Sequence, residues 1–428
     1  MAPLQASLGT SPHSNPHTPI TVCLVGAGTW GSTYHTFALK YPHLMKIVAV
    51  VSPVKFRRNT LAQRLDLPSE RVFSDWRELA SLPKIADAVL ITTSDSSVYE
   101  ACMLFAQLKY HILLEEPHDI DIQKCHAIVE AAAQNSVVFS VGNSIRYTSC
   151  NRTLKKIVDS GSIGEIMSIQ HLEKIGFQSL PYSITKSSRR HQDSSLALVT
   201  KNIDGIELVS WLMDSPCRKI SAFGNMFQNA NKKSECAFLT GKSCANPVVI
   251  QESRWAPYSS DSLYYDIPTG FSPFNHLATP APSPLETDIY KNHVVNMEFD
   301  EGKTCSFTLI SGGLETSRTT RIFGTLGELE CDGNVIRQFD FLTRRSELIR
   351  PDVDAAEQAA DHDGDYGLIE EFLENIRWGR GQWGPEHGFE ELRSRMYVLA
   401  AEQAQASGSV VNVDDCRTKW FGDVMEVY

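Results

Sequence analysis

Residues 20–31 constrain the fold more than any other part of this chain. They read Ile-Thr-Val-Cys-Leu-Val-Gly-Ala-Gly-Thr-Trp-Gly, an apolar strand that runs straight into the spacing Gly26-x-Gly28-x-x-Gly31. The first glycine permits a tight turn, the second lets the backbone approach a pyrophosphate, and the third lets a helix pack on the strand. With the helix-like segment 32–41 and a second strand at 46–51, this βαβ unit predicts a dinucleotide site at the helix N-terminus. The alternative is a glycine-rich turn in an unrelated α/β protein.

Length and composition limit the class of protein. A chain of 428 residues is too long for one ordinary core, so we expect two domains. A net charge of −11 argues against a nucleic-acid-binding surface, and no apolar run approaches the roughly 20 residues of a membrane span. Residues 1–18 are rich in Pro, Ser, His and Thr and lack the features of a signal or transit peptide, so we expect a disordered tail.

The ten cysteines are scattered, and several lie inside apolar patterns. This usage fits buried, reduced thiols and predicts a cytoplasmic protein. Cys236 and Cys244 share a polar loop, but two cysteines at that spacing are a weak metal signal, so no metal site is expected and their role stays open.

Strand and helix signals alternate over the first third of the chain. Helix-like segments at 97–108 and 122–134 separate strand-like runs at 47–51, 88–92, 110–114 and 137–141. This alternation predicts a doubly wound parallel sheet, a Rossmann domain over residues 19–145. The ligand of such a sheet lies beyond the carboxyl ends of its strands, so the loops there are expected to converge on one crevice.

A different pattern begins near residue 146. Helices are expected at 151–160, 202–212, 364–379 and 390–406, and strands at 168–174, 219–224, 293–299, 304–310 and 319–323. Residues 255–287 have no clear period and are expected to form a long surface loop, whose role stays open. We therefore predict that residues 146–428 form an α+β domain on a largely antiparallel sheet.

Several segments together resemble the glucose–fructose oxidoreductase / inositol dehydrogenase (Gfo/Idh/MocA) family over residues 20 to about 415. They are the glycine motif, Ala-Asp-Ala-Val-Leu-Ile-Thr-Thr at 86–93, Leu-Leu-Glu-Glu-Pro at 113–117, Val-Gly-Asn-Ser-Ile-Arg-Tyr at 141–147, Gly-Ser-Ile-Gly-Glu-Ile at 161–166, Arg-Ile-Phe-Gly-Thr-Leu-Gly-Glu-Leu at 321–329 and His-Asp-Gly-Asp-Tyr-Gly at 362–367. The resemblance implies a Rossmann domain, an open-faced C-terminal sheet, bound NAD(P) and redox chemistry on sugars or polyols. It also makes a homo-oligomer through the C-terminal sheet an expectation.

The residues that follow the second strand bear on the choice of cofactor. NAD-binding folds place an acidic residue there to accept the ribose hydroxyls. This chain instead has Ser52, followed by Lys55, Arg57 and Arg58, so NADP is favoured over NAD; the alternative is a solvated basic turn. The expected cofactor contacts are Gly26, Gly28, Thr29, Trp30, Gly31, Ser52, Arg57, Arg58, Thr93, Glu115 and Arg146, the last from its match to a family position.

The catalytic positions implied by the resemblance are replaced in this chain. Glu116 stands where the family has the lysine of its Glu-Lys-Pro motif, and a carboxylate repels developing alkoxide charge. Thr200 and Asp204 occupy the places of an Asp and a His one helical turn apart, and Val98 that of another histidine. Lys201 matches the lysine of one family branch, although an exposed lysine at a helix start is an equal alternative. His191 is the best remaining titratable group nearby. The candidate catalytic residues are Lys201, His191, Asp204 and Glu116.

Three functions fit these observations. The favoured one is an NAD(P)-dependent oxidoreductase that acts on a small hydroxylated or carbonyl substrate with non-standard acid/base residues. The second is a redox-silent biosynthetic enzyme that uses the same pocket, such as an isomerase, a lyase or a pericyclase of the Diels–Alderase kind, because such reactions need shape and placed dipoles more than a proton shuttle. The third is a non-catalytic dinucleotide-binding regulator.

Overall fold

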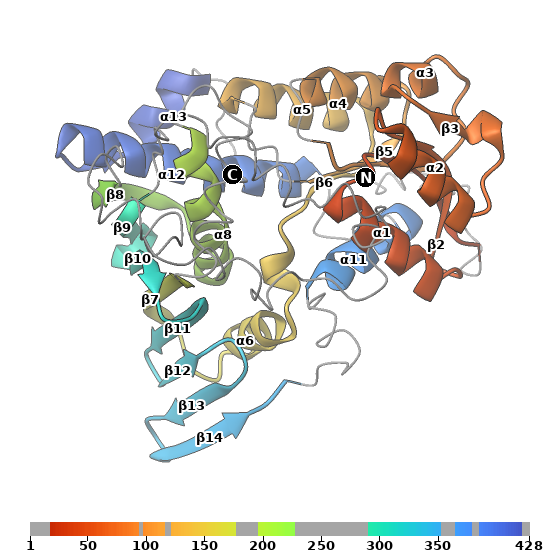
Figure 1. The fold of residues 1–428 in the computed structure, drawn as a ribbon. Coiled ribbons are helices and arrows are strands. Elements are labelled where there is room, and N and C mark those ends of the chain that lie inside the picture. The colour runs from red at the N-terminus through yellow and green to blue at the C-terminus, as the bar shows by residue number, and fades with distance from the viewer. Residues whose placement is uncertain are drawn as a thin grey trace, which may run out of the picture. The chain divides into compact units, whose positions relative to one another are not determined.

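Two compact units divide the chain (Figure 1). The computed structural model describes residues 18–93, 97–115, 121–176, 196–226, 290–351, 364–378 and 385–421. The first unit consists of Met1–Pro117, His126–Gly142 and Tyr366–Phe389, and the second of His118–Cys125, Asn143–Asp365 and Glu390–Tyr428.

The first unit is built on a six-stranded, fully parallel sheet in the order β3-β2-β1-β4-β5-β6. This strand order is that of the Rossmann fold, as the sequence predicts. In chain order the strands are β1 (Ile20–Val25), β2 (Met45–Val51), β3 (Val72–Phe73), β4 (Ala88–Ile91), β5 (His111–Leu114) and β6 (Phe139–Val141).

Helices cover both faces of this sheet, which is why its strands are nearly continuous apolar runs. All four residues of β4 are buried, and so are five of the six in β1. In Figure 1 three helices lie along one face, α3 (Trp76–Ala80), α4 (Val98–Gln107) and the larger part of α5 (Ile122–Asn135), and two lie on the other, α1 (Thr29–Lys40) and α2 (Lys55–Arg64). The short 3-10 helix η1 (Ser69–Arg71) precedes β3.

A helix from the far end of the sequence completes the first unit. α11 (Asp365–Trp378) packs against α1, where the rings of Phe37 and Tyr366 meet edge to face with their centroids 5.2 Å apart. Tyr366 also contacts Tyr41 at 6.0 Å, and only 4% of its surface is exposed. The boundary expected at residue 145 does not include this late segment in the first unit. The segment joins that unit through aromatic packing between residues more than 300 positions apart.

The second unit contains a nine-stranded sheet in the order β14-β13-β12-β11-β7-β10-β9-β8-β15. Its pairs are antiparallel except β7 with β10, which confirms the largely antiparallel sheet predicted from the sequence. The strands are β7 (Ile166–Gly176), β8 (Cys217–Met226), β9 (Tyr290–Phe299), β10 (Thr304–Gly313), β11 (Ser317–Gly324), β12 (Gly327–Cys331), β13 (Ile336–Asp340), β14 (Arg345–Ile349) and β15 (Val411–Asn412).

The two faces of this sheet differ in burial. One face packs on α8 (Leu196–Met213) and carries the buried His171 and Phe307, whereas Gln170 and Asn296 on the other face are exposed. The remaining helices are η2 (Ser144–Tyr147), α6 (Ser149–Asp159), η5 (Asp300–Gly302), α12 (Pro385–Ser407) and α13 (Val413–Phe421). α8 begins six residues before the helix expected from the sequence.

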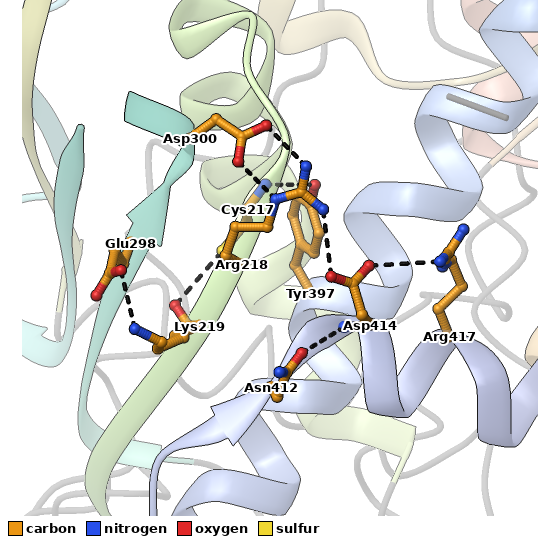
Figure 2. A network of polar contacts seen from close by, with 9 residues as sticks. All are labelled: Cys217, Arg218, Lys219, Glu298, Asp300, Tyr397, Asn412, Asp414 and Arg417. Carbon is orange, nitrogen blue, oxygen red and sulfur yellow. Dashed lines mark hydrogen bonds and ion pairs between the residues drawn. The ribbon is translucent and has the colours of Figure 1, made fainter. Parts of the chain in front are cut away.

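A polar network joins four of these elements (Figure 2). The guanidinium of Arg218, on β8, donates to both carboxylate oxygens of Asp300 at 2.5 and 2.8 Å and to Asp414 of α13 at 3.2 Å. Beside it the hydroxyl of Tyr397, on α12, accepts a hydrogen bond from the Cys217 backbone N–H at 3.0 Å. The network ties the end of the sheet to α12 and α13.

Among the described residues no helix is long and apolar enough to cross a membrane.

Candidate functional site

The turn after β1 fits only glycine at its first position. Gly26 has φ +115°, and a Cβ there would lie 2.3 Å from Oγ1 of Thr92 and 3.1 Å from the backbone nitrogen of Thr93. The hydroxyl of Thr92 donates to the Gly26 carbonyl at 3.1 Å. The end of β1 is therefore pressed against the end of β4, and Thr93 lies directly beside the glycine turn.

The N-terminus of α1 follows this turn and has no side-chain cap. Its N-cap residue is Gly28, and its first turn contains no acidic residue. A Cβ at Gly28 would meet no atom within 4 Å, whereas one at Gly31 would lie 2.5 Å from the carbonyl oxygen of Gly26. The second glycine thus leaves the helix end open to a ligand, and the third brings helix and turn into contact. A helix end of this kind favours an anion.

Basic residues and a second uncapped helix N-terminus, that of α2, follow the end of β2. Ser52 is buried, and its hydroxyl accepts from the backbone N–H of Val54 at 3.3 Å. Nη1 of Arg58 donates to the carbonyls of Ser52 and Pro53, both at 3.1 Å, which holds the guanidinium at the strand end. α2 starts here with Lys55, has no side-chain cap and has no acidic residue in its first turn. The positive end of a helix and its cations are therefore placed together.

Glu115, at the end of β5, is a buried carboxylate that binds α1. Its Oε1 accepts a short hydrogen bond from the hydroxyl of Tyr34, and 8% of the residue is exposed. A Cβ at Gly142 would lie 2.8 Å from Oε2 of Glu115, so the turn after β6 closes over the same carboxylate. The structure thus brings Glu115 together with the helix whose N-terminus forms the glycine site.

In the second unit Arg146 lies between two carboxylates, in a group we call the Arg146 cluster (Arg146, Glu207 and Glu390). Its Nε forms an ion pair with Glu207 of α8, and its Nη1 donates to Glu390 of α12 at 2.8 Å. Arg146 is 6% exposed and Glu207 1%. The guanidinium also lies over the ring of Trp211, with its carbon 5.6 Å from the ring centroid. This charge is neutralised within the unit, and its expected cofactor contact stays a prediction.

Asp204 belongs to a second group, the Arg318 cluster (Arg318, Glu173 and Asp204). Nη2 of Arg318 donates to Glu173 at 2.9 Å and lies 3.7 Å from Oδ2 of Asp204. Glu173 is buried beneath α8, whereas the side chain of Asp204 retains 29% of its exposure. Asp204 is thus a partly buried carboxylate of α8 that lies beside a cation.

The buried face beneath α8 also carries two histidines that are neutral at pH 7. Burial lowers the pKa of His171 to about 4, and it lowers that of His293 to the same value. Nδ1 of His171 is 2.9 Å from Oγ1 of Thr320, and its ring stacks on Phe307. His293 is fully buried, in line with the sheet position expected for it.

Several predicted site residues lie outside the described residues. These are Glu116 and His191, the side chains of Thr29, Trp30 and Lys201, the cysteines 236 and 244, and the segment 255–287. Lys201 is described as part of the backbone of α8, three residues before Asp204. Val98 is the first residue of α4 and is buried.

Comparison with known proteins finds a family model that matches the Rossmann part of the chain. Residues 20–143 match the model of an oxidoreductase family with an NAD-binding Rossmann fold, Gfo/Idh/MocA. Over residues 20–143 the chain therefore has the NAD-binding Rossmann fold of that family. The glycine turn, open helix end and basic second strand end described above are the parts of it that fit a dinucleotide.

The curated relatives match this chain over only part of their own length. A putative oxidoreductase, YteT of Bacillus subtilis, is 24% identical over 57% of this chain and 60% of its own. The scyllo-inositol 2-dehydrogenase (NADP(+)) IolW of the same organism is 26% identical over 35% of this chain and 40% of its own. The chain therefore covers about half the length of these relatives.

The solved structures extend the likeness in fold to nearly the whole chain. An oxidoreductase from Agrobacterium radiobacter, in complex with NAD+, L-tartaric acid and magnesium, has a TM-score of 0.68. The match covers 92% of this chain and 99% of the other at 13% identity. The fold of the second unit is thus also shared with a solved structure, at low sequence identity.

Reasoning from sequence missed most partners in the two clusters. Glu207 lies three residues after Asp204 on α8, and this helical spacing is a signal that the sequence does contain. Glu173 and His171 are two positions apart and both lie on the buried face of β7, where a strand pattern is expected to place apolar residues. Glu390 and Arg318 carry no such local signal, because their contacts join segments far apart in the chain.

Proposed function

We propose that this chain is an NADP-dependent oxidoreductase that acts on a small hydroxylated or carbonyl substrate. The observation that carries the proposal is the pair of uncapped helix N-termini at the carboxyl edge of the Rossmann sheet, the first behind Gly26 and the second behind Ser52. Two such ends fit two phosphate groups, the pyrophosphate and a 2′-phosphate, because each offers backbone N–H groups and the positive end of a helix dipole.

The preference for NADP rests on the end of β2. Gly26, Gly28 and Gly31 would hold the pyrophosphate, and Ser52, Arg57 and Arg58 the 2′-phosphate. A carboxylate at position 52 would accept ribose hydroxyls but repel a phosphate, whereas the Ser52 hydroxyl and the Arg58 guanidinium do not. The name of the relative IolW also carries NADP(+).

The acid/base role is assigned to α8. The cofactor, when bound, supplies the hydride acceptor or donor. Asp204 accepts a hydrogen bond from a substrate hydroxyl, and Arg318, whose guanidinium lies 3.7 Å from Oδ2 of Asp204, orients the carboxylate. Lys201, from its position in α8, is the candidate proton donor, and Glu116 and His191 remain candidates on sequence alone.

A titration of the purified chain with NADPH and NADH tests the cofactor assignment. We expect NADPH to bind at least about 10-fold more tightly, a difference of about 1.4 kcal/mol. Ser52→Asp should weaken NADPH binding by about 10-fold or more and improve NADH binding, because the new carboxylate repels the 2′-phosphate. Lys46→Ala, an exposed cation at the opposite end of β2, is the control. Equal affinities for the two cofactors, unchanged in Ser52→Asp, would contradict it.

Absorbance at 340 nm over a panel of polyols, sugars and their ketones tests the reaction. Asp204→Asn should lower kcat by about 100-fold, within the range of general acid–base effects, while NADPH still binds. Asp159→Asn, an exposed carboxylate on α6, is the matched control. Tight binding of NADPH without turnover of any substrate would favour the redox-silent enzyme or the regulator instead.

A further inference from the structure

Two cysteines of the second unit lie in contact although 181 positions separate them. Cys150 is in the first turn of α6, and Cys331 is the last residue of β12. Their sulfur atoms are 3.0 Å apart, and the two residues are 3% and 2% exposed. A disulfide bond measures ~2.05 Å, so an approach of about 1 Å would join them.

The surroundings of the pair favour a thiolate at Cys331. Its sulfur accepts a hydrogen bond from the backbone N–H of Gly333 at 3.4 Å and shares a second one with the sulfur of Cys150, in which either thiol can donate. These contacts lower the pKa of Cys331, chiefly through the hydrogen bond with Cys150. Burial has the opposite effect on Cys217, whose pKa it raises to about 12. Cys331 is thus the better nucleophile, and Cys150 is positioned as its partner.

We propose that Cys150 and Cys331 form a redox-active pair that a hydroperoxide converts into a disulfide. With hydrogen peroxide, the Cys331 thiolate attacks one oxygen and the O–O bond breaks. Hydroxide is released, and Cys331 becomes a sulfenic acid. The Cys150 thiol then attacks that sulfur and the S–S bond forms. The displaced hydroxide takes up the Cys150 proton to leave as water. The two thiols are oxidised by two electrons, and the peroxide is reduced.

Cys331 is buried, but it is directly followed in the chain by exposed residues. These are the turn residues Asp332, Gly333 and Asn334, of which Gly333 has a φ of +94°. The disulfide would join the start of α6 to the end of β12 and close a loop of about 180 residues. Such a cross-link restricts the unfolded chain strongly, so the oxidised protein should unfold at a higher temperature.

Treatment of the intact, reduced chain with hydrogen peroxide, followed by alkylation and peptide mass mapping, tests the proposal. We expect a cross-linked pair of peptides that contain Cys150 and Cys331, lighter by two hydrogen atoms and separated by a thiol reductant. The midpoint of thermal unfolding should rise by about 5 °C or more. This measurement needs no variant, so a folding defect does not confuse it.

Three variants divide the roles within the pair. Cys331→Ser should abolish the cross-link, and Cys150→Ser should leave a sulfenic acid at Cys331 that a dimedone probe traps. Cys416→Ser, also at a buried cysteine, should leave the cross-link intact. The proposal fails if Cys150 and Cys331 remain alkylatable after peroxide treatment, or if they cross-link only once the chain is denatured.

Discussion

The ionisable side chains of this protein show how far a residue's chemistry depends on contacts that its sequence neighbours do not reveal. The sequence predicts a cofactor contact for Arg146 and gives no sign of its pairing with Glu207 and Glu390, the latter 244 positions away. The glycine turn is the opposite case, because its constraints are local and residue spacing alone predicts them. The sequence thus predicted constraints between residues a few positions apart, but it did not predict contacts between residues far apart in the chain.

Glu402 gives a prediction at this scale. Its Oε1 is buried without a hydrogen-bond partner among the described residues, and burial raises its pKa to about 8. The folded state therefore keeps a proton that the unfolded state releases above about pH 4.5, so stability falls as pH rises from about 4.5 to 8. Glu402→Gln should remove this slope and be more stable than the wild type by about 1–3 kcal/mol at pH 8.5. Urea unfolding at pH 5 and 8.5 measures it, and an unchanged slope would contradict it.

At the scale of elements, periodicity predicted several of the buried strands but missed β12, whose burial alternates, and the exposed strand β14. β4 and β10 were predicted within two or three residues, because burial imposes apolar runs or alternation on them. β14 has the sequence Arg-Ser-Glu-Leu-Ile, and four of its five residues are exposed. A strand with little of either face buried carries no hydrophobic alternation, so the sequence offers no signal for it.

The Arg146 cluster predicts how three elements are held together. Arg146→Ala should cost about 3–5 kcal/mol, because it leaves the buried Glu207 unpaired, and Arg146→Met with Glu207→Leu should recover most of that loss. Arg218→Met is the matched control, since its pairs with Asp300 and Asp414 are exposed and worth at most about 1 kcal/mol in total (Figure 2). Urea unfolding of the four proteins measures these differences. Equal costs for the two single variants would show that burial of the cluster has no energetic consequence.

For the whole molecule, the sequence predicted a parallel Rossmann sheet followed by a largely antiparallel sheet. The structure confirms both sheets. The sequence did not predict that Tyr366–Phe389 returns to the first unit. The helical pattern of this segment was visible, but nothing in an amphipathic helix states which of two cores it covers. Side-chain packing decides that, here through Tyr366 against Phe37 and Tyr41.

Tyr366→Ala tests this return. The variant removes a ring that is 4% exposed, so we expect a loss of about 3–5 kcal/mol, as for other buried aromatic residues. Hydrogen exchange should speed up in α1, whereas Tyr366→Phe, which keeps the ring contacts, should exchange as the wild type does. Protection of α1 that is the same in both variants would mean that α11 does not stabilise the first unit.

The position of α11 late in the chain also affects the order in which the protein folds during its synthesis. A ribosome makes the glycine turn and all six strands of the first sheet within the first 141 residues, but the helix that covers Phe37 follows only after residue 364. The chain between them, which folds into most of the second unit, is therefore synthesised while the first core still exposes an aromatic surface. The first unit is therefore begun first, but it cannot complete its core until most of the second unit has been synthesised.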